Sequence, residues 1–519
     1  MESDPESDCL ETCFARLLRG PSEVFKLRKP VRLRVGEEIV DLSSLEARRR
    51  ACQQEERLGR ILAPGLVLGV RPLVRDAQGV ERMGGEGRTV DWALHMRRLP
   101  DEERADRRLA AGTLEDDHLY AIARHLAVFH AEAREHVLPP PPHDVLESLR
   151  ALVDLRITSP DGPSPEREPA ELAAIEARQH ELLESRADRL RRRSQEATIR
   201  ESHGELTLEH VFVAASGEVR ILAGLEMAPL LRPADVAADV AFLASDLAAY
   251  RRVDLAERFV AEYARCANDF DLYPLLDFHA SLRAALRGKL DWHCATVLTR
   301  DERSSRRYRE RARRFFALAL SAPRRPLLPA AVVAMGGQVA SGKSTLASEI
   351  ARRIGAPVVG ADATRDFLLG ARPVDAPHEI RWEESFSADF PDRCYAEVLR
   401  RAGEVLESGR PVVIDGCFRS RAQRAKARLL AERFGRPFLF VEAWVSAGLQ
   451  RERLSERALR DDVPLTAWQE IADGLREAWE PADELDREEY LRLDTFLPLE
   501  TSLERLESRL PTWPETLRG

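Results

Sequence analysis

Residues 330–345 read Ala-Ala-Val-Val-Ala-Met-Gly-Gly-Gln-Val-Ala-Ser-Gly-Lys-Ser-Thr, and this stretch decides the fold of the last third of the chain. It begins with an apolar run typical of a buried strand, passes through a glycine-rich loop and leads into a helical pattern at 344–353. The loop has the spacing G-x-x-x-x-G-K-[ST], which is specific when a strand precedes it and a helix follows. The sequence therefore predicts a phosphate-binding loop (P-loop).

The predicted P-loop supplies the groups that bind the phosphates of ATP. Gly337 and Gly342 let the backbone curl so that its N–H groups point at phosphate oxygens, and the N-terminus of the following helix adds partial positive charge. Lys343 is expected to reach the β- and γ-phosphates, and Ser344 to offer its hydroxyl to Mg²⁺. We therefore expect ATP and Mg²⁺ as cofactors. The predicted ATP-binding residues are Gly337, Gln338, Val339, Ala340, Ser341, Gly342, Lys343, Ser344 and Thr345.

Strand and helix signals alternate after the P-loop. Apolar runs at 357–359, 412–414 and 438–441 are each followed by a segment with a helical pattern. This alternation predicts an α/β domain in which a parallel sheet is covered by helices on both faces. In such sheets the ligand binds beside the carboxyl ends of the strands. Polar residues that directly follow a strand are therefore candidates for the site.

Asp362 and Arg365 follow the second of these strands. An aspartate at this position can accept the proton of an acceptor hydroxyl, and an arginine one helical turn later can bind an anionic or polar group of the acceptor. The alternative for Asp362 is structural, because aspartate is also a favourable N-cap of the helix that follows. We predict that Asp362 is the general base, a role that is compatible with capping.

Asp415, Arg453 and Arg457 complete the predicted site. Asp415 ends the third strand, beside the P-loop strand, where an acidic residue suits an outer ligand of Mg²⁺; a structural aspartate at a strand end is the alternative. Arg453 and Arg457 lie one turn apart on one helical face. Arginines that close over ATP stabilise the phosphoryl group in transfer, although an arginine-rich surface helix would show the same pattern.

The composition is that of a globular protein with sizeable cores. Of the 519 residues, 44% are hydrophobic and 32% charged, with a formal net charge of -9, so no bulk attraction to nucleic acid or anionic lipid is expected. The seven cysteines are scattered, which favours reduced thiols over a disulfide framework. The chain shows neither the pattern of a signal peptide nor an apolar run that could span a bilayer. We therefore expect a cytoplasmic protein without a membrane partner, and the sequence does not indicate its oligomeric state.

Proline-rich segments divide the chain. The segment 321–329, Ser-Ala-Pro-Arg-Arg-Pro-Leu-Leu-Pro, separates an arginine-rich helical region from the strand before the P-loop, and segments of this composition typically mark domain boundaries. We predict a first domain at 1–322, a linker at 323–329 and a P-loop domain at 330–519. Within the first domain, short strand signals around a helix at 45–62 precede a helical region, so an α+β domain with two lobes is expected.

Residues 330–480 resemble the P-loop kinases that phosphorylate small hydroxyl acceptors or nucleic-acid ends, such as polynucleotide 5′-hydroxyl kinase, zeta toxins and gluconate-type kinases. The resemblance implies that Asp362 and Arg365, in the pattern D-x-x-R, are the base and the acceptor-side arginine. The acidic residue that ends the third strand in the family matches Asp415, and the lid arginine of the family matches Arg453 or Arg457. The family usually has Thr or Ser where Cys417 stands, and this departure concerns contacts to the acceptor rather than ATP binding.

The first domain resembles the aminoglycoside-phosphotransferase-like domain, a kinase-like fold that is often fused to such a P-loop kinase. The matching stretches include 24–30, 96–100, 203–206 and 235–243. In kinase-like enzymes the corresponding pattern H-G-D-L-x-x-x-N supplies a catalytic aspartate and a metal-binding asparagine. From residue 203 to residue 210 the present chain reads His-Gly-Glu-Leu-Thr-Leu-Glu-His instead.

The active-site positions of the first domain depart from that pattern. Glu205 stands in place of the catalytic aspartate and is one methylene longer, and His210 replaces the amide with a poorer ligand for Mg²⁺. Ala223 stands at the second metal-binding position, unless Glu226 takes that place. We therefore interpret the first domain as a pseudokinase with a regulatory, scaffolding or substrate-presenting role. Lys26 is either a phosphate contact or a surface lysine.

The leading hypothesis is an ATP-dependent kinase that phosphorylates a hydroxyl acceptor through the P-loop domain. The alternatives are an ATP-dependent switch or scaffold without a dedicated acceptor, and a phosphotransferase that acts through the first domain. Asp362 and Arg365 favour the kinase, since a switch needs no acceptor base, and Glu205 opposes the last alternative. The sequence does not identify the acceptor; a small molecule is favoured and a nucleic-acid 5′ end is also open.

Overall fold

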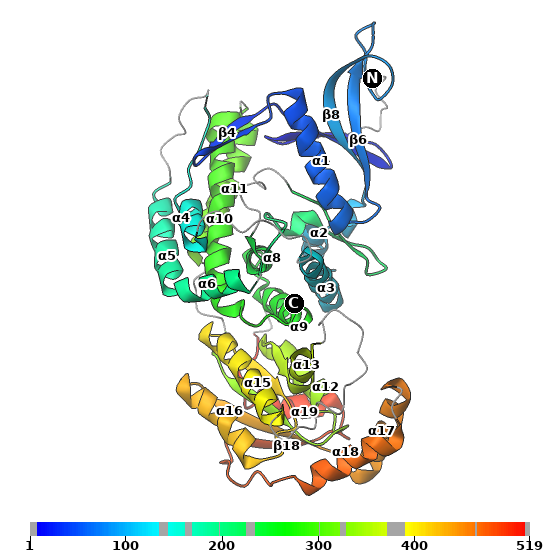
Figure 1. Cartoon of the computed structure of the whole chain (residues 1–519), viewed down its shortest axis with the longest axis vertical. Coiled ribbons are helices and arrows are strands. Elements are labelled where there is room, and N and C mark those ends of the chain that lie inside the picture. Colours follow the sequence, from blue (N-terminus) through cyan, green and yellow to red (C-terminus); the bar gives the residue numbers. More distant parts are fainter. Residues whose placement is uncertain are drawn as a thin grey trace. The chain divides into compact units, whose positions relative to one another are not determined.

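The structure is a computed structural model of the chain, shown as a cartoon in Figure 1. It describes residues 8–133, 144–160, 169–196, 198–224, 234–299, 301–321, 328–370, 390–461 and 464–513. The chain forms two compact units, and each has its own hydrophobic core. The first unit contains Met1–Tyr250 and Leu276–Arg324, and the second contains Arg251–Leu275 and Arg325–Gly519.

The second unit is built on a five-stranded sheet of order β15-β16-β14-β17-β18, in which every neighbouring pair is parallel. The first four of these strands confirm the sequence prediction. The last, β18, was not predicted, because its run Tyr-Leu-Arg-Leu-Asp is short and carries charges. The strands are β14 (Val332–Gly336), β15 (Val358–Gly360), β16 (Val412–Asp415), β17 (Phe438–Trp444) and β18 (Tyr490–Asp494).

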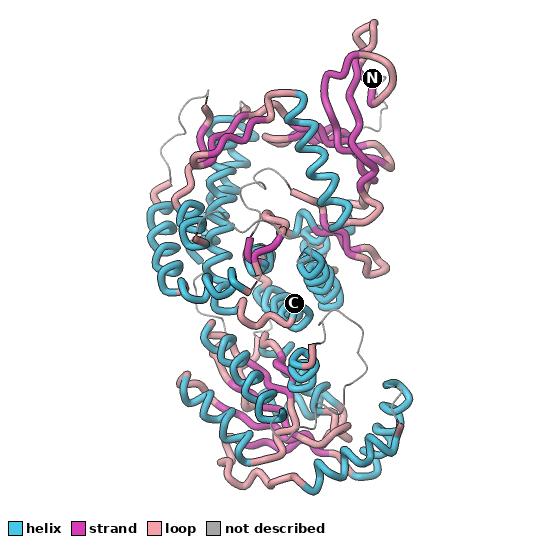
Figure 2. Tube along the Cα trace, in the orientation of Figure 1, coloured by secondary structure: helices cyan, strands magenta, loops and turns pink. Residues whose placement is uncertain are grey.

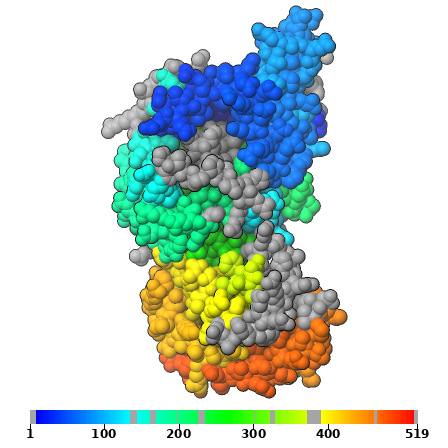
Figure 3. Space-filling model, in the orientation of Figure 1, coloured from blue at the N-terminus to red at the C-terminus, as the bar shows by residue number. Residues whose placement is uncertain are grey.

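Helices cover both faces of this sheet, as predicted. Side chains alternate between the faces along each strand, and Val333 of β14 packs in one cluster with α12 (Lys343–Ile354) and α19 (Leu499–Glu507). The helices α15 (Phe390–Glu407) and α16 (Arg421–Arg433) contact the sheet from the other face. In the space-filling view, the yellow to orange residues that include these two helices form part of the outer surface of the second unit (Figure 3).

One helix of the second unit comes from an unexpected part of the chain. The segment Arg251–Leu275 follows α8 (Val236–Ala249) and precedes α10 (Leu276–His293) of the first unit, yet it joins the second unit. The sequence assigned this segment to the first domain, and residues 323–327 of the expected linker lie outside the described residues. The helix of this segment is α9 (Val253–Ala267), and the second unit also contains α13 (Ala361–Leu368), α17 (Ala447–Asp461) and α18 (Leu465–Glu477).

In the first unit most strands precede the helical part, with one helix among them and short strands again between residues 157 and 235, and this is the predicted order of an α+β domain with two lobes. Helices and strands are distinguished by colour in Figure 2. Its antiparallel sheet has the order β1-β2-β3-β8-β6-β7, and α1 (Leu45–Leu62) contacts β6 and β8. The strands of this sheet are β1 (Asp8–Glu11), β2 (Ala15–Arg19), β3 (Glu23–Arg28), β6 (Val67–Arg75), β7 (Glu81–Met83) and β8 (Arg88–Arg97). The helical part contains α2 (Ala105–Ala110), α3 (Asp116–Ala133), α4 (Val145–Val153), α5 (Glu171–Ser185), α6 (Ala187–Gln195), α8, α10 and α11 (Glu302–Ser321).

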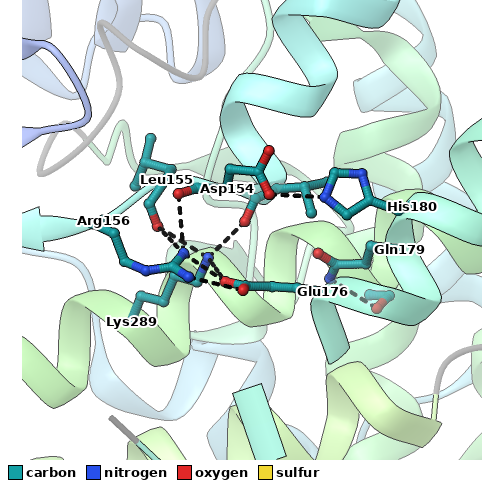
Figure 4. A network of polar contacts seen from close by, with 9 residues as sticks. Asp154, Leu155, Arg156, Glu176, Gln179, His180 and Lys289 are labelled. Atoms are coloured by element: carbon teal, nitrogen blue, oxygen red, sulfur yellow. Dashed lines mark hydrogen bonds and ion pairs between the residues drawn. The ribbon is translucent and has the colours of Figure 1, made fainter. Parts of the chain in front are cut away.

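A buried lysine joins three parts of this helical region (Figure 4). Lys289 of α10 donates hydrogen bonds to the carbonyls of Val153 and Leu155, at 2.7 and 3.0 Å, and to the carboxylate of Glu176 in α5, at 2.8 Å. Arg156 also donates to Glu176, at 2.6 Å. Because an ammonium has three donors and all three are used, the charge is tolerated in the interior. We interpret this network as structural.

The cysteines and the helices bear on two further sequence predictions. All seven cysteines are free thiols in the structure. None of the described helices has the length and apolarity that crossing a membrane requires.

Candidate functional site

The P-loop leaves β14 and ends in α12, as its spacing predicted. Gly337 and Gly342 have φ values of 137° and 84°, which favour glycine. A Cβ at Gly337 would lie 2.5 Å from the carbonyl oxygen of Ala443, and one at Gly336 would lie 2.3 Å from the ring of Phe440. Glycine at these positions therefore lets the loop pass close to β17 and turn into the N-terminus of α12.

An open cavity of about 770 Å³ lies over the P-loop. Its lining combines P-loop residues with residues of α13, of α17 and of the segment that follows β18. The structure thus brings together the predicted phosphate-binding, base and lid residues, whereas Arg365 and Asp415 do not line this cavity. The polar and charged lining residues include Lys343, Ser344, Asp362, Arg453, Arg457 and Thr495.

Gln450 of α17 fixes the P-loop from a distant part of the sequence. Its side chain is buried, and its Nε2 donates to the carbonyl of Val339 at 2.9 Å and to Oε1 of Gln338 at 3.2 Å. Arg476 of α18 donates to Oε1 of Gln450 at 3.0 Å. Sequence reasoning missed this residue, because a single glutamine 112 positions after its partner carries no local signal.

Asp415 lies at the end of β16, beside the P-loop strand. In the register of the sheet it is the partner of both Met335 of β14 and Gly360 of β15, so three strand ends meet here. Burial raises the pKa of the Asp415 carboxyl, and the Lys343 ammonium and the Ser344 hydroxyl partly offset this effect. Its Oδ1 is buried and has no hydrogen-bond partner among the described residues.

These features fit a Mg²⁺ site formed by Ser344 and Asp415. An unsatisfied buried carboxylate oxygen next to a hydroxyl offers the hard oxygen donors that Mg²⁺ prefers. Within the described part of the chain, no cluster of three or more His, Cys, Asp or Glu side chains could hold a metal by itself. Mg²⁺ in nucleotide sites typically uses one or two protein ligands and completes its shell with phosphates and water, so two ligands are sufficient.

Asp362 and Arg365 lie on α13 and form an ion pair. Arg365 Nη1 donates to Asp362 Oδ1 at 3.0 Å, and Asp366 accepts two further bonds from the same guanidinium, at 3.1 and 2.9 Å. Burial alone would lower the pKa of Arg365, but the two carboxylates raise it above its ordinary value. Arg365 is therefore firmly charged and faces Asp362 rather than the cavity.

The capping alternative for Asp362 is wrong. The N-cap of α13 is Gly360, and no side chain makes a capping hydrogen bond there. Asp362 lies inside the first turn, its side chain is 68% exposed, and it lines the cavity over the P-loop. An acceptor can therefore reach this carboxylate, which a general base requires.

Arg453 and Arg457 both line the cavity, and each is held by a different neighbour. Arg453 donates to Thr495, whose hydroxyl donates to the carbonyl of Ser341 in the P-loop at 2.7 Å. The guanidinium of Arg457 lies over the ring of Trp468 in α18, 4.1 Å from its centroid. The two arginines are therefore not free surface residues, and Thr495 is a site residue that the sequence did not reveal.

Cys417 follows β16 and lies beside the P-loop. Its carbonyl accepts a hydrogen bond from the backbone N–H of Gly337 at 3.1 Å. Burial raises the pKa of the Cys417 thiol, so the group is neutral and only a weak hydrogen-bond donor. At this position the chain offers less polarity than the hydroxyl expected from the resemblance.

The first unit has a separate cavity of about 300 Å³, which Lys26, Glu205 and His210 line. Lys26 of β3 donates to the carboxylate of Glu55 in α1 at 2.6 Å, and Arg28 donates to the same carboxylate at 2.5 Å. Lys26 is therefore held in an ion pair rather than free on the surface. A lysine of the strand sheet paired with a helix glutamate is a feature of protein kinases.

The metal-binding side of this cavity differs from that of an active kinase. The buried carboxylate of Glu205 forms an ion pair with Arg287 at 3.3 Å, and His210 Nδ1 shares a hydrogen bond with the Thr207 hydroxyl at 3.0 Å. Ala223 offers no ligand, and Glu226 lies outside the described residues. Among the described residues, the cavity thus combines the ion pair of Lys26 and Glu55 with a Glu205 carboxylate that is already paired, and it has no ligand at position 223.

Comparison with known families identifies the second unit. Residues 332–478 match the AAA_33 family, described as an AAA domain. The match begins at β14 and ends at the C-terminus of α18, and it includes the P-loop, α13, β16 and α17. The second unit therefore contains a P-loop domain of this family.

The whole chain is similar to uncharacterized proteins of mycobacteria. Rv2004c of Mycobacterium tuberculosis and Mb2027c of Mycobacterium bovis are each 28% identical to it over 510 residues, which span 96% of this chain and 94% of the relative. The similarity therefore extends over the sequence of both units.

Two of the solved structures to which the chain is similar are described as kinases. A gluconokinase from Sinorhizobium meliloti 1021 is 23% identical and covers 36% of this chain and 93% of its own, with a TM-score of 0.26. An ethanolamine kinase of Plasmodium vivax is 12% identical and covers 61% of this chain and 83% of its own, with a TM-score of 0.36.

Proposed function

We propose that the second unit is an ATP-dependent kinase that transfers the γ-phosphoryl group of ATP to a hydroxyl acceptor. The observation that carries the proposal is the exposed carboxylate of Asp362, which lines the same cavity as Lys343 and Ser344. A protein that only binds or hydrolyses ATP as a switch needs phosphate-binding groups but no carboxylate that an acceptor can reach. The match to a P-loop family supports the nucleotide-binding part.

The polar residues named above for this site have the following roles in the proposed reaction. The P-loop amides and Lys343 hold the β- and γ-phosphates, and Mg²⁺ held by Ser344 and Asp415 supplies charge neutralisation when bound. The acceptor oxygen forms a bond to the γ-phosphorus while the bond to the β,γ-bridging oxygen breaks, and ADP leaves. Asp362 takes the proton of the acceptor hydroxyl, and Arg453 and Arg457 stabilise the charge that develops on the transferred group.

We further propose that the first unit is a pseudokinase. The ion pair of Lys26 with Glu55 supports retention of a nucleotide or another anion in its cavity. The pairing of Glu205 with Arg287 opposes proton abstraction by that carboxylate, because a guanidinium stabilises the charged form and makes it a weaker base. A regulatory or substrate-presenting role for this unit is consistent with both observations.

The proposal is tested by incubating the full-length protein with γ-radiolabelled ATP and Mg²⁺ and a panel of acceptors: sugars, sugar phosphates, nucleosides, small alcohols and oligonucleotides with a 5′-hydroxyl end. We expect label on one acceptor class, and none in the Lys343→Ala variant. Release of inorganic phosphate at the same rate with and without every acceptor would instead show an ATP-dependent switch. We favour a small-molecule acceptor, and label on the oligonucleotide alone would overturn that preference.

A further inference from the structure

We propose that Arg251–Leu275, which the chain inserts between α8 and α10 of the first unit, positions helix α13 of the second unit. The position of α13 matters because this helix carries Asp362 and Arg365. The role given to these residues rests on the proposed function, whereas the contacts described below do not depend on it.

Arg401 of α15 joins the inserted segment to α13. It is buried, and its Nη1 donates to Oδ1 of Asn268 at 2.8 Å and to the hydroxyl of Thr364 at 3.0 Å. Asn268 is the C-cap of α9 and adopts a left-handed conformation with a φ of 53°. Thr364 is fully buried in α13, directly before Arg365. One guanidinium nitrogen thus links the end of α9 to the helix that carries the predicted base.

Arg401 also contacts an aromatic ring of the inserted segment and one of α13. The guanidinium carbon of Arg401 lies 5.7 Å from the ring centroid of Phe270 in the inserted segment and 4.8 Å from that of Phe367 in α13. Nε of Arg401 donates to Glu397 at 2.8 Å, so the plane of the guanidinium is fixed. A planar donor held in this way presents its remaining N–H groups in a defined direction. Arg401 therefore transmits the position of Asn268 and Phe270 to α13.

The inserted segment is itself anchored in the second unit. Asp271 accepts hydrogen bonds from Arg400 of α15 at 2.6 and 3.1 Å, and Glu257 accepts one from Arg410 at 2.7 Å. Arg258 donates to a carbonyl in the last turn of α12 at 3.3 Å, and Val253 packs against the hydrophobic cluster under the sheet. The segment therefore contacts the helix that follows the P-loop as well as α15.

Helix α13 needs such support. It has only eight residues, and helices below about 12–15 residues are marginal on their own in water. Thr364 is its only buried residue, so the contact to Arg401 is the main buried polar attachment of the helix. The inserted segment is continuous in sequence with the first unit at both of its ends.

The test is hydrogen–deuterium exchange on the full-length protein, read at peptides that cover 361–368. In Asn268→Ala, Arg401 loses an acceptor, and we expect exchange in α13 to become at least about tenfold faster. Asn268→Asp keeps an acceptor oxygen and is expected to restore native exchange. Glu262→Gln is the matched control, because Glu262 lies in the same helix but pairs only with its neighbour Arg265 and contacts Cys266. Affinity for the ATP analogue AMP-PNP is measured in parallel and should stay within about twofold of wild type.

Selective loosening of α13 with rescue by Asn268→Asp and unchanged AMP-PNP affinity supports the proposal. Native exchange in α13 of Asn268→Ala overturns it, and so does faster exchange throughout the second unit, which would indicate a general stabilising role. If Asn268→Ala does not fold, Arg401→Lys serves the same purpose, since an ammonium cannot bond Glu397, Asn268 and Thr364 in one plane. The two proposals can fail separately. If Asn268→Ala speeds exchange in α13 but the wild-type protein phosphorylates no acceptor, the present inference holds and the proposed function is rejected.

Discussion

Arg453 donates hydrogen bonds to both the side-chain hydroxyl and the main-chain carbonyl of Thr495, each at 2.9 Å. The hydroxyl of Thr495 in turn donates to the carbonyl of Ser341 in the P-loop. This chain of contacts places Nη1 of Arg453 within 3.3 Å of where a Cβ at Gly342 would lie. Thr495 therefore holds Arg453, one of the two arginines of the predicted lid, beside the phosphate-binding loop.

Arg453→Ala should reduce phosphoryl transfer to the identified acceptor by about 10²-fold, which is typical for the loss of one fixed donor to developing charge. Thr495→Val should act in the same direction with a smaller effect, because Arg453 keeps its bond to the carbonyl. Arg451→Ala is the control, since Arg451 is an exposed arginine of the same helix that bonds only a carbonyl of its own helix. Equal turnover in Arg453→Ala and Arg451→Ala would show that Arg453 is structural.

Lys343→Ala should weaken ATP binding by about 2 kcal/mol or more, or roughly thirtyfold, because an ammonium opposite phosphate charge is removed from the loop. Transfer should fall below detection. Isothermal titration with AMP-PNP measures the affinity. Unchanged affinity together with unchanged turnover would reject the P-loop as the nucleotide site.

The Mg²⁺-dependent part of ATP affinity should decrease at low pH because of Asp415. Burial raises the pKa of this carboxyl, so it takes up a proton at a higher pH than an ordinary aspartate, whose pKa is about 3.9. The neutral carboxyl is not a ligand for Mg²⁺. The contribution is therefore complete near neutral pH and is lost as the pH falls through the raised pKa.

Asp415→Asn provides the comparison for this pH dependence. Near neutral pH the variant should bind ATP with Mg²⁺ more weakly than wild type, and its affinity should not decrease further as Asp415 would become protonated. Because ATP titrates identically with both proteins, the difference between the two affinity curves reports Asp415 alone. Affinity in EDTA should be the same for both. Parallel pH curves for wild type and Asp415→Asn would exclude Asp415 as a metal ligand.

Glu205 of the first unit should not support phosphoryl transfer. In full-length Lys343→Ala the P-loop of the second unit is disabled, so any remaining transfer would come from the first unit. We expect no Mg²⁺-dependent transfer, because Glu205 is ion-paired with Arg287 and Ala223 offers no metal ligand. Residual transfer in this variant that disappears when Glu205→Gln is added would show that the first unit is active. Nucleotide binding without transfer agrees with the proposal.

The sequence predicted those parts of the site whose signal is local. The P-loop spacing located Lys343, and strand–helix alternation located Asp415, which ends β16. Thr495 and Gln450 reach the loop from 154 and 112 residues away, and neither belongs to a spaced motif. The insertion of 251–275 into the second unit was equally hidden, because its amphipathic pattern fits a helix of either unit. Long-range contacts of this kind depend on the packing of the whole unit.

Asp362→Asn is the most direct test of the proposed chemistry. The amide keeps the shape of the side chain and its hydrogen bond to Arg365, but it cannot accept the proton of the acceptor. Because Gly360 rather than Asp362 caps α13, the change should cost little stability. We therefore expect a normally folded protein that binds AMP-PNP like wild type and loses at least about a hundredfold in kcat, within the range for loss of a general base.

The control for this prediction is Asp366→Asn, which changes the other carboxylate that Arg365 contacts. If Asp362 acts only by orienting Arg365, the two variants should lose similar amounts of activity, and the acceptor KM should rise more than kcat falls. If Asp362 is the base, Asp366→Asn should stay within a few-fold of wild type, and the loss in Asp362→Asn should lie in kcat measured at saturating ATP and acceptor. A kcat of Asp362→Asn within a few-fold of wild type would contradict the assignment of Asp362 as the base. The proton of the acceptor would then have to pass directly to solvent or to the phosphoryl group, which a loose transition state for phosphoryl transfer permits.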